Sequence, residues 1–267
     1  MILTSMGQGL WRRLRAAAVV FFVPLHLVCF DLALRLAIVC RSERCVLRVV
    51  RGAAHSMNTL LGVLCGMRVR IDPRLSEVLR TTRETIVVAN HHSPLDIQVL
   101  QYAMSQRTIH FVCREGLERG LPFISRNIRH ACAVLRKDAR ENEATLAGLA
   151  RRITAQGNVA VIFPEGRKSA RNYPALLPFK SRGLDVLTTH APAAQVITVA
   201  LRGTHDAWPG PGHLPGQGVV IEVILVDTVP GGSVRGPELA RHCEMRIRQA
   251  LGGAAPPMPQ TSPRLWA

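Results

Sequence analysis

From residue 69 onward, strand-like and helix-like segments alternate along the chain, and this order limits the folds open to it. Runs rich in β-branched residues predict strands over residues 67–71, 85–89, 109–113, 159–163, 196–201 and 219–226. Helical periodicity predicts helices near residues 121–128, 143–156 and 237–251. The run at 159–163 is apolar throughout, which is typical of a strand buried on both faces. The pattern predicts an α/β domain over residues 69–251, with a mostly parallel central sheet flanked by helices, and a disordered Pro- and Gly-rich tail over residues 252–267.

The first 68 residues have a different pattern, with apolar runs at 16–30 and 57–67. Asp31 and Arg35 interrupt the continuation of the first run at a spacing that lets them pair on one helix. The segment between the runs carries basic residues suited to lipid headgroups: Arg41, Arg44, Arg48 and Arg51. We therefore expect residues 1–68 to form an N-terminal membrane-associated helical hairpin, with a buried pair of core helices as the alternative.

Basic residues outnumber acidic ones, because 34 Lys and Arg against 18 Asp and Glu give a formal net charge of +16. Such an excess predicts a polyanionic partner: nucleic acid, an anionic lipid surface or a phosphorylated ligand. Aromatic residues are only 4% of the chain, and it has no recognisable nucleic-acid-reading module, so we expect no nucleic-acid partner. The seven cysteines form no Cys-x-x-Cys pair, which predicts reduced thiols and a domain that faces the cytoplasm.

The first chemical motif, Asn90-His91-His92-Ser93-Pro94-Leu95-Asp96, follows the predicted strand at 85–89. Its Ser-Pro step predicts a helix start, which leaves His91 on a loop and puts Asp96 in the first helical turn, from where its carboxylate can reach back. An imidazole held by a carboxylate is a general base. Two other interpretations stay open: the acid belongs to a capping box, or the two histidines bind a metal. No third ligand lies nearby at zinc-like spacing, so we expect no metal.

The second motif, Phe163-Pro164-Glu165-Gly166-Arg167-Lys168-Ser169, stands at the C-terminal end of another predicted strand, the edge where open α/β sheets bind ligands. Pro-Glu-Gly predicts a turn whose glycine lets a ligand approach the backbone. The basic and hydroxyl residues after it are donors of the kind that hold phosphate. The motif predicts an anion-binding turn, with an ordinary solvated polar turn as the alternative.

Together these motifs resemble the glycerolipid acyltransferase family typified by 1-acylglycerol-3-phosphate acyltransferase. A His-x4-Asp block at 90–96 is followed about seventy residues later by Phe-Pro-Glu-Gly at 163–166. Further segments that resemble blocks of that family lie at 113–117 with 121–122, at 134–136 and at 178–183, and the resemblance covers residues 68–205. Arg167-Lys168 stands where the family usually has Thr-Arg, and Thr198 where it usually has proline. These departures leave the His–Asp pair intact and bear on the substrate.

The resemblance implies a membrane-associated enzyme that moves a fatty acyl chain from acyl-ACP or acyl-CoA to the sn-2 hydroxyl of lysophosphatidic acid, giving phosphatidic acid. The thioester is a co-substrate, and no other cofactor is expected. The resemblance implies that His91 is the catalytic base and that Asp96 orients it. It implies a substrate-binding set of Arg136, Glu165, Gly166, Arg167, Lys168, Ser169 and Lys180.

Two alternatives remain: an acyltransferase for another lysolipid, such as a lysophospholipid or a lyso-ornithine-type lipid, and a non-catalytic protein that binds anionic membranes. The expected partners are membrane phospholipids, lysophosphatidic acid, and acyl-carrier protein or a coenzyme A thioester, at the cytoplasmic face of the cell inner membrane. Residues 105–140 carry eight Lys and Arg against three acids, and residues 164–184 carry five against one. This concentration of charge around the motifs favours a bound anion over a merely solvated basic face.

Overall fold

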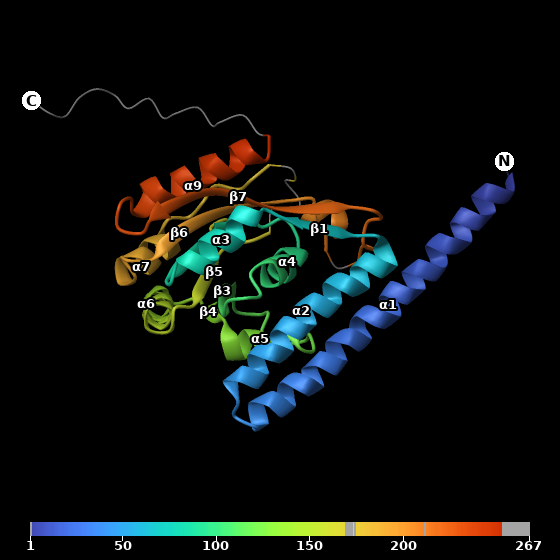
Figure 1. Cartoon of the computed structure of the whole chain (residues 1–267), viewed down its shortest axis with the longest axis horizontal. Helices are drawn as coiled ribbons and strands as arrows, with labels where there is room; N and C mark the ends of the chain where they lie inside the picture. Colours follow the sequence, from blue (N-terminus) through green and yellow to red (C-terminus); the bar gives the residue numbers. More distant parts are fainter. Residues whose placement is uncertain (1, 169–172, 174, 211, 253–267) are drawn as a thin grey trace, which may run out of the picture.

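The computed structural model describes residues 2–168, 173, 175–210 and 212–252. Its centre is a seven-stranded sheet with the strand order β1-β7-β6-β2-β5-β3-β4. The strands are β1 (Arg68–Ile71), β2 (Thr85–Ala89), β3 (Ile109–Arg114), β4 (Ala133–Leu135), β5 (Val159–Ile162), β6 (Gln195–Arg202) and β7 (Val220–Pro230). Neighbouring strands are parallel except β6 and β7, which are antiparallel. The predicted mostly parallel α/β fold is confirmed (Figure 1).

Helices cover both faces of this sheet. They are α1 (Ile2–Val39), α2 (Glu43–Cys65), α3 (Pro73–Thr81), α4 (Leu95–Ala103), α5 (Ile124–Ala131), α6 (Ala139–Gln156), α7 (Arg182–His190), α8 (Thr204–Ala207) and α9 (Gly236–Ala250). Alternate residues of β2 belong to two different cores: Val87 packs in the core that includes α2, α3, α4 and α5, and Ile86 packs in the core that includes α6, α7 and α9. Every residue of β2 is buried, which explains why four of its five residues are apolar.

The N-terminal helices α1 and α2 form the expected hairpin, with α1 lying along α2 and projecting beyond the rest of the molecule (Figure 1). The predicted ion pair is present, with 2.8 Å between Arg35 Nε and Asp31 Oδ2. In the described part of the chain, the segment Arg13–Val39 of α1 is long and apolar enough to cross a membrane. Helix α2 is not a detached unit, because Met57 and Leu61 belong to the same core as the sheet. The predicted disordered tail falls almost entirely on residues 253–267, outside the described residues.

Candidate active site

The two sequence motifs meet at the carboxyl edge of the sheet because β2 and β5 are neighbouring parallel strands. β2 ends at Ala89, just before the His-x4-Asp block, and β5 ends at Ile162, just before the Pro-Glu-Gly turn. The chain separates these motifs by about seventy residues, and the sheet brings them together.

His91 and Asp96 form a side-chain pair, with 2.8 Å between Nδ1 of the imidazole and Oδ2 of the carboxylate. The Asp96 side chain is fully buried, and the same oxygen accepts the backbone N–H groups of His92 at 2.7 Å and Ser93 at 2.8 Å. The capping role and the His–Asp contact therefore coexist in one geometry. An ionised carboxylate only accepts hydrogen bonds, so the proton of the neutral imidazole lies on Nδ1 and leaves Nε2 as the basic nitrogen.

The aromatic ring of Phe163 supports the imidazole of His91 from one side. The two ring centroids are 4.4 Å apart and the planes are inclined by 20°. The adjacent His92 has a different environment, because its ring is buried and burial lowers the pKa of its imidazole below the ordinary value. The burial of His92 is typical of a structural histidine, while His91 lines a pocket.

Glu165 holds the backbone on both sides of the site. Its Oε1 accepts the N–H of His91 at 2.7 Å, and its Oε2 accepts the N–H of Leu177 at 3.0 Å. The side chain is 2% exposed. The carboxylate thus joins the loop after β2 to the segment after the Pro-Glu-Gly turn, a contact that sequence spacing did not predict.

Gly166 and Lys180 are brought together by the same turn. Gly166 has a φ of +70°, and a Cβ at this position would lie 3.3 Å from Lys180 Nζ. The backbone N–H of Lys180 also donates to the carbonyl of Pro164 at 3.0 Å. The positive φ favours glycine here, and a Cβ would require the flexible Lys180 side chain to shift.

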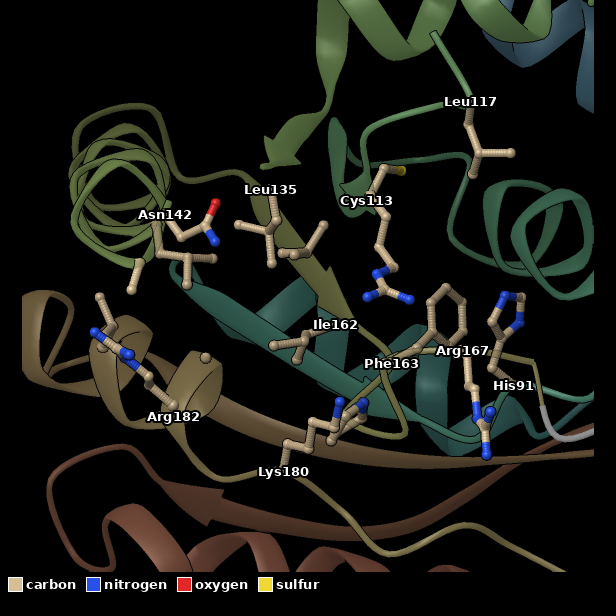
Figure 2. A pocket seen from close by; sticks show the side chains of 18 of the residues that line it. His91, Cys113, Leu117, Leu135, Asn142, Ile162, Phe163, Arg167, Lys180 and Arg182 are labelled. Carbon is tan, nitrogen blue, oxygen red and sulfur yellow. The ribbon is translucent and has the colours of Figure 1, made fainter. Parts of the chain in front are cut away.

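A pocket of about 450 Å³ extends from His91 between the sheet and α6 and α7. Figure 2 shows His91 and Arg167 toward one end of this pocket and Arg182 toward the other. Apolar lining comes from Ile97, Leu117, Leu135, Leu146, Ile162 and Val186. Basic lining comes from Arg114, Lys137, Arg167, Lys168, Lys180 and Arg182. An apolar wall with several cations suits a ligand that has both a hydrocarbon chain and phosphate groups.

Most of the predicted binding residues surround this pocket, but not all of them. Arg136 lies outside its lining, with Nε 3.0 Å from a carboxylate oxygen of Glu141 and Nη1 3.9 Å from one of Glu118. Glu165 also lies outside the lining, because its buried carboxylate accepts the backbone N–H groups of His91 and Leu177. Ser169 falls outside the described residues. Three of the lining cations were not in the predicted binding set: Arg114, Lys137 and Arg182. Arg114 and Arg182 lie within segments of the family resemblance, and Lys137 directly follows one.

Asn90 has a structural role that was not assigned from the sequence. Its amide Nδ2 donates to the carbonyl of Leu201 at 2.9 Å, and its Oδ1 accepts the N–H of the same residue at 2.7 Å. This pair of hydrogen bonds joins the end of β2 to the end of β6 at the first residue of the Asn90–Asp96 motif. An asparagine immediately after a buried strand was the available signal.

The fold and the site define an acyltransferase. The Acyltransferase family model matches residues 70–202, and the chain belongs to this family. Among solved structures, it is similar to the crystal structure of the 1-acyl-sn-glycerophosphate (LPA) acyltransferase PlsC from Thermotoga maritima. The TM-score is 0.69 with 21% sequence identity, over 90% of this chain and 94% of that chain. The likeness supports the fold over most of the chain. No curated protein matches this chain significantly by sequence.

Proposed function

We propose that this protein transfers a fatty acyl chain from a thioester donor, acyl-ACP or acyl-CoA, to the sn-2 hydroxyl of lysophosphatidic acid, giving phosphatidic acid. The observation that carries the proposal is the pairing of His91 with the buried carboxylate of Asp96, at the wall of a pocket lined by apolar and basic side chains. The likeness to a solved LPA acyltransferase supports the same substrate class.

In the proposed mechanism, Nε2 of His91 accepts the proton of the acceptor hydroxyl. The oxygen then attacks the thioester carbonyl, and the carbon–sulfur bond breaks as the tetrahedral intermediate collapses. The departing thiolate takes the proton back from the imidazolium, so the enzyme ends in its starting state. Asp96 stabilises the imidazolium and keeps Nδ1 protonated. Transfer is direct, and no covalent acyl-enzyme is needed.

The charged part of the lysolipid is assigned to the cations near the Pro-Glu-Gly turn. Arg167, Lys168 and Lys180 line the pocket that also holds His91. Arg136, in its ion pairs outside the lining, is the remaining candidate for the phosphate. The hydrocarbon chains fit the apolar wall between the sheet and α6.

Membrane association is proposed to occur through the exposed face of α1. A stripe of apolar side chains at helical spacing is exposed along this helix: Phe21, Leu25, Val28, Leu32, Leu36 and Val39. Gln98 of α4 donates to the carbonyl of Ala54 in α2 at 2.6 Å. Because of this contact, a hairpin that crossed the bilayer would pull α4 into the hydrocarbon region. We propose that the hairpin lies in one leaflet of the cell inner membrane, at the cytoplasmic face, with membrane phospholipids around it.

One departure from the family pattern leaves a second acceptor class as an alternative. Arg167-Lys168 replaces the usual Thr-Arg and adds a cation beside the site. The same chemistry would then serve a lysophospholipid or a lyso-ornithine-type lipid. A non-catalytic protein that only binds anionic membranes is the remaining alternative.

A radiolabelled acyl-transfer assay with purified protein in lipid vesicles tests these proposals together. Acyl-ACP and acyl-CoA are each offered with lysophosphatidic acid, a zwitterionic lysophospholipid and a lyso-ornithine lipid. We expect the fastest transfer to lysophosphatidic acid. Faster transfer to an acceptor without a phosphomonoester would refute the headgroup assignment, and vesicle binding without transfer to any acceptor would refute the enzymatic proposal.

A further inference from the structure

Asp31 is a carboxylate in the middle of the apolar helix α1, and its side chain is only 8% exposed. A buried carboxylate is costly unless charged or hydrogen-bonding partners surround it. One partner, Arg35, lies one turn away on the same helix. The Asp31–Arg35 spacing alone does not predict burial, because this pair could equally form on an exposed face of the helix.

The other partners of Asp31 belong to the catalytic domain. Its Oδ1 accepts Nε of Arg126 at 2.7 Å and the backbone N–H of Phe123 at 3.0 Å, while its Oδ2 accepts Nε of Arg35 at 2.8 Å. Phe123 and Arg126 lie at the start of α5, about ninety residues along the chain from Asp31. The carboxylate therefore ties the hairpin to the domain.

The contact with Asp31 holds Phe123 in a backbone conformation that few residues other than glycine adopt. Phe123 has a φ of +59° and a ψ of −56°, in a region unfavourable for a residue with a Cβ. Its N–H is held by Asp31, and its ring makes an edge contact with Phe30 of α1, with centroids 6.1 Å apart. Such a conformation persists only where surrounding contacts enforce it, and here the contacts come from α1.

Phe123 is the last residue of the segment that connects β3 to α5 along the pocket. The near end of this segment is fixed by the sheet, because the N–H of Glu115 donates to the carbonyl of Leu135 at 2.9 Å. Arg114 is the last residue of β3 and Leu117 lies in the connecting segment, and both line the pocket together with His91. Between the ends, Gly116 and Gly120 have positive φ values of 98° and 91°. The far end thus depends on contacts with α5 and with Asp31.

We propose that Asp31 is a positioning residue that makes the hairpin part of the wall of the substrate pocket. By fixing Phe123 and Arg126, it sets the path of residues 115–122 and thereby the placement of Leu117 at the pocket. The hairpin then shapes the site as well as holding the protein at lipid. The effect on catalysis rests on the proposed acyltransferase function, but the tie itself does not.

Asp31→Ala and Arg35→Ala form a matched pair for the test, in the full-length protein. Both variants remove the pair within α1, but only Asp31→Ala also removes the contacts to Phe123 and Arg126. Hydrogen exchange of the backbone amides of residues 115–123 is followed in vesicles of phosphatidylglycerol and phosphatidylethanolamine. We expect about tenfold faster exchange in Asp31→Ala and less than about twofold change in Arg35→Ala. Exchange unchanged in Asp31→Ala, or raised equally in both variants, would overturn the tie.

Acyl-transfer kinetics then test the effect on the pocket. We expect Asp31→Ala to raise the KM for lysophosphatidic acid about five- to tenfold while kcat stays within about twofold, because the His91–Asp96 pair is untouched. A lower kcat with an unchanged KM, or no kinetic change despite faster exchange, would overturn the positioning role. If Asp31→Ala does not fold, Arg126→Ala serves the same comparison with the same expected KM. An inactive wild type would refute the proposed function and leave the exchange result to decide on the tie.

Discussion

At the scale of single residues, three donors converge on one oxygen of Asp96: Nδ1–H of His91 and the backbone N–H groups of His92 and Ser93. Among the described residues, its other oxygen, Oδ1, has no hydrogen-bond partner. The sequence left two interpretations of this aspartate open, a capping acid and a catalytic partner. It could not decide between them because one carboxylate oxygen makes both sets of contacts, with the backbone N–H groups and with the imidazole of His91.

This arrangement makes Asp96→Asn an informative substitution. The amide oxygen can take the place of the carboxylate oxygen that accepts the three donors, so the start of α4 is preserved. The negative charge is lost, and an amide NH2 takes the place of the buried Oδ1. We expect acyl transfer to fall by about two to four orders of magnitude, because the imidazolium of His91 is no longer stabilised. The rate with a radiolabelled donor measures this, and the melting temperature reports the fold. A variant of unchanged rate would exclude a catalytic role for the charge.

His110 predicts a dependence of stability on pH. Its Nδ1–H donates to the carbonyl of Ala131 at 2.7 Å, its Nε2 accepts from Asn158 at 3.1 Å, and burial lowers the pKa of the imidazole below its ordinary value. The unfolded histidine takes up a proton near pH 6.5, before the folded one does. Stability is therefore lost as the pH falls below about 6.5, by at most about 1.4 kcal/mol per pH unit for one group.

Thermal unfolding at about pH 7 and pH 5.5 tests this expectation. The melting temperature of the wild type should fall on acidification, and His110→Gln should lose less over the same interval. A residual loss is expected, because burial also lowers the pKa of His92. Equal losses in the two proteins would contradict a contribution from His110.

At the scale of secondary-structure elements, the strands were easier to predict than the helices. The runs at 85–89 and 159–163 are mostly apolar because β2 and β5 are buried on both faces, and this burial is visible in composition. The helices α3 and α7 were not predicted, since each spans only nine residues and buries a narrow face. A start signal was present for α3, where Asp72 accepts the N–H of Arg74 at 3.0 Å.

The C-terminal helix α9 supports the site through one acid. Oε2 of Glu244 accepts the N–H of Phe179 at 2.8 Å, and Phe179 directly precedes Lys180 in the pocket lining. Glu244→Ala should release this segment and raise the KM for lysophosphatidic acid about three- to tenfold, with little change in kcat. Glu238→Ala, at an exposed position of the same helix, is the control. Equal effects of both substitutions would show that the contact does not position Lys180.

At the scale of the whole molecule, the sequence motifs predicted which residues form the site, but not the long-range contacts that hold those residues in place. Spacing and family resemblance predicted His91, Asp96 and the basic turn, because these residues lie in short segments. The clamp from Asn90 to Leu201 and the tie from Asp31 join segments about ninety residues or more apart. Such contacts depend on strand order and helix packing, which no local pattern encodes.

The exposed face of α1 predicts how the molecule meets a bilayer. Leu32 is 56% exposed on this face, and Leu214 is 52% exposed in the loop before β7. Leu32→Glu should weaken binding to anionic vesicles about tenfold, because a charge replaces a side chain that would be buried in lipid. Leu214→Glu should bind as the wild type does. Vesicle sedimentation measures both, and equal binding of the wild type and Leu32→Glu would place the membrane surface elsewhere.

The central claim is that one imidazole removes the proton from the acceptor hydroxyl, and acyl transfer by His91→Ala tests it most directly. The variant and the wild type are compared on vesicles that contain lysophosphatidic acid and a radiolabelled acyl thioester, with vesicle binding measured in parallel. We predict that transfer is lost while binding is retained. Transfer at the wild-type rate by a folded, vesicle-bound His91→Ala protein would contradict the account.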